Sequence, residues 1–363
     1  MFDQIKEFIN PSKNPDLTQA YEFQRQHLPT LWLLGKTGAG KSSFIQAVTG
    51  LSAIQVGNGF EPCTLTAQAY EFPKDKPIMR FLDTRGLGEA DYDPAQDLKE
   101  IAQLGNAVVV VMKADEPEQS AVLAALKQIK KNKQIKHLLL IHSAVLLADI
   151  NQRERQIAFN ENQLRAVWGK SFESVFVDFE QEDGCVYNYD LLLTELTKIL
   201  PVIDLLVLNK EHTTIEGQNF DKIQNEVLWY AGSASASDLI PGVGLVSVPA
   251  IQAKMLHALA NQYSVEWNKR TFSELIGTLG SGFALQYSVK LGARQLIKFI
   301  PVYGQTVGAV AAAAMSFGTT YGLGRTACYY FYYKSIGEHV SEQSMQELYK
   351  KSLKKGKVAS GYE

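Results

Sequence analysis

The stretch Gly35-Lys36-Thr37-Gly38-Ala39-Gly40-Lys41-Ser42 decides the fold of this chain. The apolar run Leu31-Trp32-Leu33-Leu34 ends at its first glycine, which predicts a buried parallel strand leading into a loop. Residues 42–48 then predict a helix. A strand, a glycine-rich loop and a helix in this order point several backbone N–H groups toward one place, at the positive end of the helix dipole.

The pattern GxxxxGK[ST] in this context predicts a phosphate-binding loop. Glycines let the backbone N–H groups turn inward around phosphates. We expect Lys41 to reach the β- and γ-phosphates and Ser42 to give its hydroxyl to Mg²⁺. The ligand predicted is a nucleoside triphosphate with magnesium. The binding residues expected in this segment are Gly35, Lys36, Thr37, Gly38, Ala39, Gly40, Lys41, Ser42 and Ser43.

A second motif, Asp83-Thr84-Arg85-Gly86, follows a predicted strand at residues 78–82. Alone, such a motif is typical of a surface turn. After a strand that neighbours a phosphate loop, a carboxylate can hold Mg²⁺, usually through water, and a glycine N–H can approach the γ-phosphate. We therefore predict Asp83 as a metal-binding residue. Gly86 is expected at the γ-phosphate, acting in catalysis with Lys41.

The segment between these motifs supplies a candidate threonine. Gly57-Asn58-Gly59 is a loop signal, and Pro62-Cys63-Thr64-Leu65-Thr66 enters an alternating stretch. Thr64 is the residue we expect to complete the Mg²⁺ shell and to serve catalysis, with Thr66 as the alternative. Two ordinary strand threonines would give the same pattern.

Beyond the second motif, apolar strands alternate with amphipathic helices. Such alternation predicts an α/β fold, a doubly wound and mostly parallel sheet of the P-loop NTPase type. The strands expected are 107–112, 137–141 and 174–179, and the helices expected are 94–104, 118–131, 154–168 and 189–200.

Length and composition suggest a multidomain globular protein. The chain has 363 residues, 46% hydrophobic and 20% charged, with a net charge of −2. No basic surplus points to nucleic acid, so no nucleic-acid partner is expected. Three dispersed cysteines, Cys63, Cys185 and Cys328, suit a reducing cytoplasm. The organisation we predict is a helical segment 1–28, the nucleotide domain 29–200, a helical connector 201–230, a Gly/Ala-rich all-α domain 231–340 and a polar tail 341–363.

GKTGAGKSS, the Pro-Cys-Thr segment and DTRG, in this order, resemble the Era-like and septin-like GTPases over roughly residues 31–200. The resemblance implies guanine nucleotide with Mg²⁺ and a hydrolase. Where Ras-like proteins carry a water-orienting glutamine, this chain has Leu87, as is common in that branch. The resemblance therefore implies slow hydrolysis that needs a partner, a homodimer contact through the nucleotide domain or a potassium ion to position water.

The residues that read the base depart from the family pattern. These GTPases carry an [NT]KxD box after the strand found here at residues 137–141, but this sequence has His142-Ser143-Ala144-Val145. The lysine is absent, and so is the aspartate that accepts two hydrogen bonds from guanine. The choice of GTP as the nucleotide therefore rests on the resemblance alone. A P-loop ATPase or kinase is a less favoured alternative to a GTPase.

Three apolar or glycine-rich stretches precede an alanine-rich predicted helix: Ile240-Pro241-Gly242-Val243-Gly244-Leu245, Ile251-Gln252-Ala253-Lys254-Met255-Leu256 and Ile300-Pro301-Val302-Tyr303-Gly304. On these stretches, residues 231–340 resemble the uncharacterised domain that follows the GTPase domain in bacterial Era-like proteins, which implies membrane association. Residues 299–324 are long enough to span a bilayer but weakly hydrophobic. Small residues recur at Gly304, Gly308, Ala312, Gly318 and Gly322, which suits close helix packing. The run 329–334 resembles an interfacial aromatic belt. A close-packed soluble bundle is the equal alternative.

The function predicted is a Mg-dependent GTP-binding switch, or slow GTPase, coupled to a helical domain that docks a membrane or a partner. The expected location is cytoplasmic, at the cytoplasmic membrane as a peripheral or integral protein if the helical domain binds there. The alternative is a membrane-inserting effector or interaction module in which the nucleotide is structural.

Overall fold

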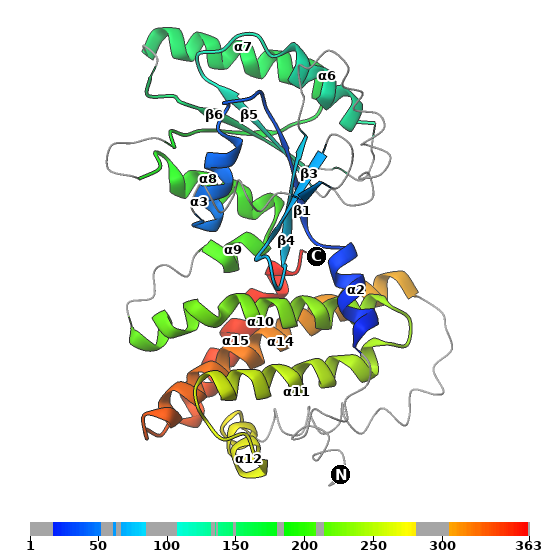
Figure 1. Ribbon diagram of the computed structural model, residues 1–363, viewed down its shortest axis with the longest axis vertical. Helices are drawn as coiled ribbons and strands as arrows, with labels where there is room; N and C mark the ends of the chain where they lie inside the picture. Colours follow the sequence, from blue (N-terminus) through cyan, green and yellow to red (C-terminus); the bar gives the residue numbers. More distant parts are fainter. Residues whose placement is uncertain are drawn as a thin grey trace. The chain divides into compact units, whose positions relative to one another are not determined.

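The computed structural model describes residues 17–51, 61–62, 67–84, 107–131, 135, 137–147, 150–179, 185–207, 214–280 and 305–361. The chain forms two compact units. Leu28–Val207 is the α/β unit, whereas Met1–His27 and Leu208–Glu363 together form the helical unit (Figure 1). In sequence, the α/β unit thus lies between the helix at residues 18–26 and the helices on which that helix packs.

Seven strands within the described residues form one sheet in the order β2-β3-β4-β1-β5-β6-β7. The neighbours from β4 to β7 pair in parallel, whereas β2–β3 and β3–β4 pair antiparallel. This mixed, mostly parallel α/β sheet confirms the predicted fold class. The strands are β1 (Thr30–Leu34), β2 (Glu61–Pro62), β3 (Ala67–Phe72), β4 (Met79–Thr84), β5 (Ala107–Lys113), β6 (His137–Ser143) and β7 (Glu173–Phe176).

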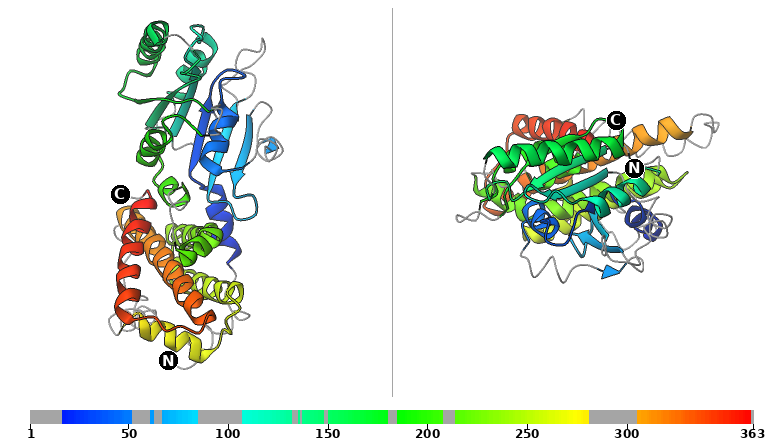
Figure 2. Two further views of the ribbon diagram at one scale, coloured as in Figure 1. Left: turned by 90° about the vertical axis from the view of Figure 1, so that its left-hand side faces the viewer. Right: turned by 90° about the horizontal axis from the view of Figure 1, so that it is seen from above.

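Helices cover both faces of this sheet (Figures 1 and 2). α6 and α7 lie on one face and α3 and α8 on the other, with α9 after α8. The helices of this unit are α3 (Lys41–Thr49), α6 (Ser120–Ile129), α7 (Ile150–Trp168), α8 (Tyr189–Ile199) and α9 (Val202–Val207). The helix expected at residues 94–104 lies outside the described residues.

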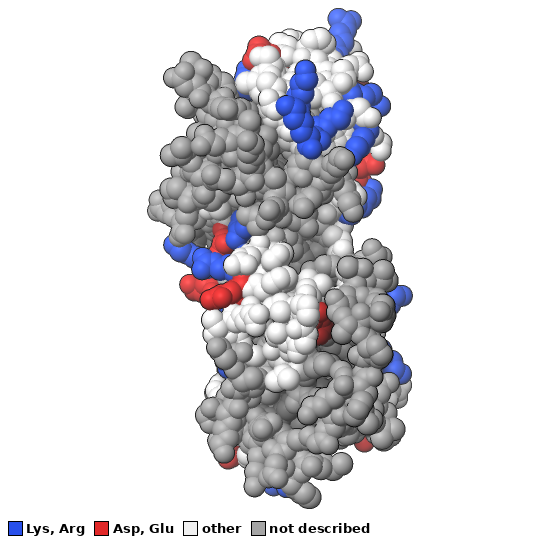
Figure 3. Space-filling model, turned by 90° about the vertical axis from the view of Figure 1, so that its right-hand side faces the viewer, with Lys and Arg blue, Asp and Glu red and all other residues white. Residues whose placement is uncertain are grey.

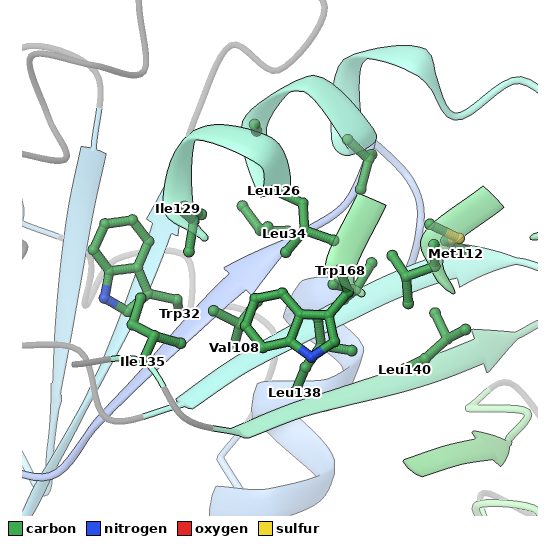
Figure 4. Packing of buried hydrophobic residues seen from close by; sticks show 14 of the residues in the cluster. Trp32, Leu34, Val108, Met112, Leu126, Ile129, Ile135, Leu138, Leu140 and Trp168 are labelled. Atoms are coloured by element: carbon green, nitrogen blue, oxygen red, sulfur yellow. The ribbon is translucent and has the colours of Figure 1, made fainter. Parts of the chain in front are cut away.

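The core shows why both strand faces are apolar. Alternate residues of β1, β5 and β6, among them Trp32, Val108 and Leu140, pack beneath α6 and α7 with Leu126 and Trp168 (Figure 4). The residues between them along each strand are buried too, because the opposite face is also covered. Continuous burial of β1 along its five residues matches the continuous apolar run of a two-sided parallel strand.

The helical unit is a bundle of long helices. It contains α2 (Thr18–Gln26), α10 (Ile215–Leu239), α11 (Gly244–Gln262), α12 (Lys269–Thr278), α14 (Gln305–Ser335) and α15 (Glu342–Ala359). α2 packs on α10: the Tyr21 and Trp229 rings lie 4.7 Å apart, and Gln24 Nε2 donates to the Trp229 carbonyl at 3.1 Å. The segment expected as a connector at residues 201–230 therefore contains α9 and much of α10, a central helix of the bundle.

Small residues of α14 make close packing inside this unit. A Cβ on Gly318 would lie 2.9 Å from the Leu353 carbonyl of α15, and one on Gly322 would lie 3.2 Å from the Leu353 nitrogen. Gly304 lies outside the described residues, and Gly308 has no neighbour within 4 Å of its added Cβ. The second half of the small-residue series is thus used between helices of the bundle, as the alternative reading expected.

The aromatic run on α14 also packs within the unit. Phe331 is fully buried, with its ring 5.9 Å from that of Trp267. The Tyr330 hydroxyl donates to Glu274 at 3.0 Å, and Lys334 pairs with the same carboxylate. Among the described residues, no helix combines the length and the apolar character needed to cross a membrane.

Candidate functional site

The phosphate loop joins β1 to α3. Gly35 is buried, and a Cβ there would stand 2.6 Å from the Val111 carbonyl of β5, so only glycine fits this approach. Gly40 caps α3 with φ +99°, in the left-handed region that favours glycine. Its carbonyl accepts the first helical bond from Phe44 N at 2.8 Å. The spacing of the glycines is therefore required by the strand–loop–helix geometry.

Lys41 lies over the loop that it follows. Its Nζ donates to the carbonyls of Gly35 at 2.8 Å and Lys36 at 3.2 Å, and it stands 3.8 Å from Asp83 Oδ1. The register pairs Leu33 of β1 with Asp83 of β4, which places the carboxylate beside the start of the loop. The structure thus brings Lys41 and Asp83 together, as the two motifs led us to expect.

The remaining predicted residues divide into two groups. Thr37, Gly38 and Ser42 are exposed at the loop and at the first turn of α3, where a ligand can reach them. Lys36 and Ser43 are half-buried, and Ala39 is buried. Thr64, its alternative Thr66, Gly86 and Leu87 lie outside the described residues, so the structure does not place them.

An ion-pair cluster holds the side chain of Lys36. Its Nζ pairs with Glu116 and, at 2.8 Å, with Glu118; both carboxylates follow β5. Hydrogen bonds from Lys36 and from the side chain and backbone of Ser120 lower the pKa of Glu118 to about 2. The hydrogen bond to Glu116 raises the pKa of Lys36. This cluster, which sequence reasoning missed, ties the phosphate loop to the segment after β5.

The carboxyl ends of β6 and β7 also reach the loop. The Ser143 hydroxyl donates to the Ala39 carbonyl at 2.7 Å. Phe179, after β7, has its Cδ2 3.4 Å from the point where a Cβ on Gly40 would stand. Asp178 Oδ2 accepts from Leu146 N at 3.2 Å. The sequence predicted that β6 ends at residue 141, two residues before its observed end at Ser143. The residues after β6 and β7 could have been found as neighbours of the loop, because the carboxyl ends of parallel strands meet at one edge of a sheet.

The arrangement has the chemistry of a triphosphate site. Backbone N–H groups at a helix N-terminus and an ammonium group suit phosphate oxygens. A hydroxyl and a carboxylate offer the oxygen ligands that Mg²⁺ prefers. Among the described residues, no cluster of three or more His, Cys, Asp or Glu side chains could hold a metal ion.

The comparison with known protein families agrees with this chemistry. Residues 30–143 match the family model described as "50S ribosome-binding GTPase". No curated protein matches the chain. A crystal structure of the bacterial selenocysteine-specific elongation factor EF-Sec is 18% identical, with a TM-score of 0.35; the match covers 50% of this chain. The chain spans about 30% of the length of that structure.

Proposed function

We propose that this chain, whose residues 30–143 match the family model described as 50S ribosome-binding GTPase, is a P-loop GTPase that acts as a Mg-dependent nucleotide switch with slow GTP hydrolysis. The observation that carries the proposal is the meeting of Lys41 with Asp83 at the phosphate loop. This contact brings an ammonium group and a carboxylate together beside the loop, which supports a site for phosphoryl transfer.

The loop residues bind and orient the triphosphate. Lys41 exchanges its bonds to the loop carbonyls for the β- and γ-phosphates, and the N–H groups that precede α3 surround the same oxygens. Ser42 and Asp83 would hold Mg²⁺, and Thr64 would join them when the triphosphate is bound. The chemistry that the metal would supply there is neutralisation of charge on the phosphate oxygens. Gly86 donates its N–H to the γ-phosphate.

Hydrolysis is slow in the isolated chain because Leu87 cannot orient water. A partner, a second copy of this chain through the nucleotide domain, or a potassium ion supplies that function. Single-turnover GTP hydrolysis across a range of protein concentrations, in sodium and in potassium buffers, tests this step. A fast rate that neither concentration nor potassium changes contradicts it.

The covalent path supports coupling between nucleotide and helical unit. Residues 27–29 alone separate the end of α2 at Gln26 from the start of β1 at Thr30, and β1 leads directly into the phosphate loop. α2 is held on α10 through Gln24, which is buried and also bonded to Ser233. A shift of β1 with nucleotide state therefore acts on a helix that is fixed to the bundle.

The docking function belongs to the helical unit, and α15 is our candidate. Lys350, Lys351, Lys354 and Lys355 are exposed on one face of α15, while Ser352 and Gly356 are buried on the other. Such a face suits an anionic surface. The family description names the 50S ribosome, and an anionic membrane surface offers the same charge.

Co-sedimentation of the full chain with 50S subunits and with anionic vesicles tests this docking role. Binding that is stronger with a non-hydrolysable GTP analogue than with GDP, and that is lost when the four lysines become glutamine, supports the switch. Vesicle binding that depends neither on the nucleotide nor on the four lysines favours the alternative function, a membrane-inserting effector in which the nucleotide is structural. The same quadruple substitution at Lys127, Lys130, Lys131 and Lys170, four exposed lysines of the α/β unit, is the matched control. Figure 3 shows that Lys and Arg side chains also gather on this unit.

A further inference from the structure

The nucleoside must leave the phosphate loop toward β6 and β7. The strand order places β4 on one side of β1 and β5, β6 and β7 on the other. Asp83, at the end of β4 and 3.8 Å from Lys41, lies on the side where the proposed function puts the metal and the γ-phosphate. A triphosphate extended across the carboxyl edge of the sheet therefore directs its base away from Asp83. Ser143 and Phe179, which contact the loop at Ala39 and Gly40, lie on that side.

A carboxylate reaches this edge from an unexpected strand. The segment after β6 carries apolar residues: Val145 is buried, and Leu146 is 47% exposed. Asp178, which follows β7, is 5% exposed and accepts a hydrogen bond from the Leu146 backbone N–H at 3.2 Å. The [NT]KxD aspartate is missing from the residues directly after β6. A carboxylate from the segment after β7, that of Asp178, contacts the same backbone instead.

The loop that meets Asp178 is held in an unusual conformation. Ala144 has φ +55°, in the left-handed region that a non-glycine residue rarely adopts. Such a conformation is strained and persists where neighbouring contacts fix it. Here the fixing contacts are Ser143 to Ala39 on one side and Asp178 to Leu146 on the other.

We propose that Asp178 is the residue that reads guanine in this chain and that Phe179 packs against the nucleoside, an assignment that rests on the proposed function. Guanine presents two N–H donors on one edge, and a carboxylate accepts up to about four hydrogen bonds. Asp178 can therefore accept from both guanine donors while it still accepts from the Leu146 backbone N–H. Adenine presents a ring-nitrogen acceptor at that edge, which the carboxylate repels. The Phe179 ring offers contact that is equal for either purine.

Calorimetric titration of the full chain with GTP, ATP, xanthosine triphosphate and inorganic tripolyphosphate separates these roles. Asp178→Asn is expected to weaken GTP about 10- to 100-fold, because a charged bidentate contact is lost. The same variant should bind xanthosine triphosphate more tightly, because a carbonyl replaces the guanine amino group in this base and accepts a hydrogen bond from the new amide. Tripolyphosphate binding should not change. Asp190→Asn is the control, because Asp190 is an exposed carboxylate in the first turn of α8. This variant should bind all four ligands with unaltered affinity.

Phe179→Leu keeps an apolar side chain beside Gly40 and is expected to weaken GTP and ATP alike, by about 10-fold, without affecting tripolyphosphate. Unchanged GTP affinity in this variant overturns the role of Phe179, whether or not Asp178→Asn folds. Equal losses of GTP and ATP in Asp178→Asn, with no gain for xanthosine triphosphate, overturn the role of Asp178. Failure of the unaltered chain to bind both GTP and tripolyphosphate would instead remove the proposed function itself.

Discussion

The ammonium nitrogen of Lys41 lies 3.8 Å from Oδ1 of Asp83, so the helix that follows the phosphate loop and the end of β4 meet at one point. The two residues are far apart in sequence, and the parallel pairing of β1 with β4 brings them together. Opposite charges at this distance stabilise each other, which keeps the ammonium group and the carboxylate side by side at the start of the loop.

Asp83→Asn should remove the dependence of nucleotide binding on magnesium. The amide keeps the size of the side chain but loses the charge that holds the metal. GTP affinity of the unaltered chain is expected to fall when Mg²⁺ is replaced by EDTA, whereas the variant should show similar, weak affinity in both buffers. A variant with the full magnesium response would show that another group holds the metal.

Gly318→Ala should destabilise the helical unit by about 1–3 kcal/mol, because the added methyl group meets the Leu353 carbonyl and the Lys357 side chain of α15. Gly308→Ala on the same helix meets no atom within 4 Å and should stabilise it by up to about 1 kcal/mol, since alanine is the better helix former. Urea unfolding followed by circular dichroism measures both. Equal effects of the two substitutions would argue against close packing of α14 on α15.

The buried ion pair between α10 and α14 gives a double-mutant test. Arg325 donates to both carboxylate oxygens of Glu216, at 2.6 and 2.9 Å, and lies 4.4 Å from the Phe220 ring centre. Glu216→Leu should cost about 3–5 kcal/mol of unfolding free energy, because it leaves a buried guanidinium unpaired. Adding Arg325→Met should recover much of that loss. A double variant as unstable as the sum of the single variants would contradict this pairing.

His142 on β6 should make the α/β unit sensitive to acid. Burial lowers the pKa of His142 to about 4, below its ordinary value of 6.5, so the unfolded chain binds a proton that the folded chain does not. Stability is therefore highest above pH 6.5 and falls as the pH drops toward 4, by about 2 kcal/mol between pH 7 and pH 5. The Glu161 carboxylate lies 3.9 Å from Nε2 of His142.

His142→Phe removes this proton-binding group and keeps an aromatic ring beside Phe176, 5.5 Å away in the unaltered chain. Urea unfolding at pH 7 and pH 5 should show a smaller stability difference in the variant, by the same 2 kcal/mol. An identical pH dependence in both proteins would assign the acid sensitivity to other residues.

Much of the α/β unit could be predicted because each element has a strong local signal. β1 and β5 are continuous apolar runs, and Gly35 and Gly40 stand where the backbone requires them. The pairing of Lys41 with Asp83 also followed from two motifs placed after neighbouring strands. Local pattern and tertiary position agree at these residues.

The place of Asp178 beside the segment after β6 could not be predicted, because it depends on tertiary neighbours. Asp178 has no motif around it, and its position matters only because β7 pairs with β6 and brings it to Leu146. The helical unit shows the same limit. The small-residue spacing around Gly318 suits a lipid bilayer and a close-packed bundle equally, and only the contact with Leu353 of α15 shows where that glycine is used.

Calorimetric titration of the full chain and of its Lys41→Ala variant with a non-hydrolysable GTP analogue and Mg²⁺ tests the central claim most directly. The account predicts saturable binding of one nucleotide per chain and its loss in the variant, with circular dichroism unchanged. Retained micromolar binding by Lys41→Ala, or no binding by the unaltered chain, would contradict the assignment of the phosphate loop as the site of a nucleotide switch.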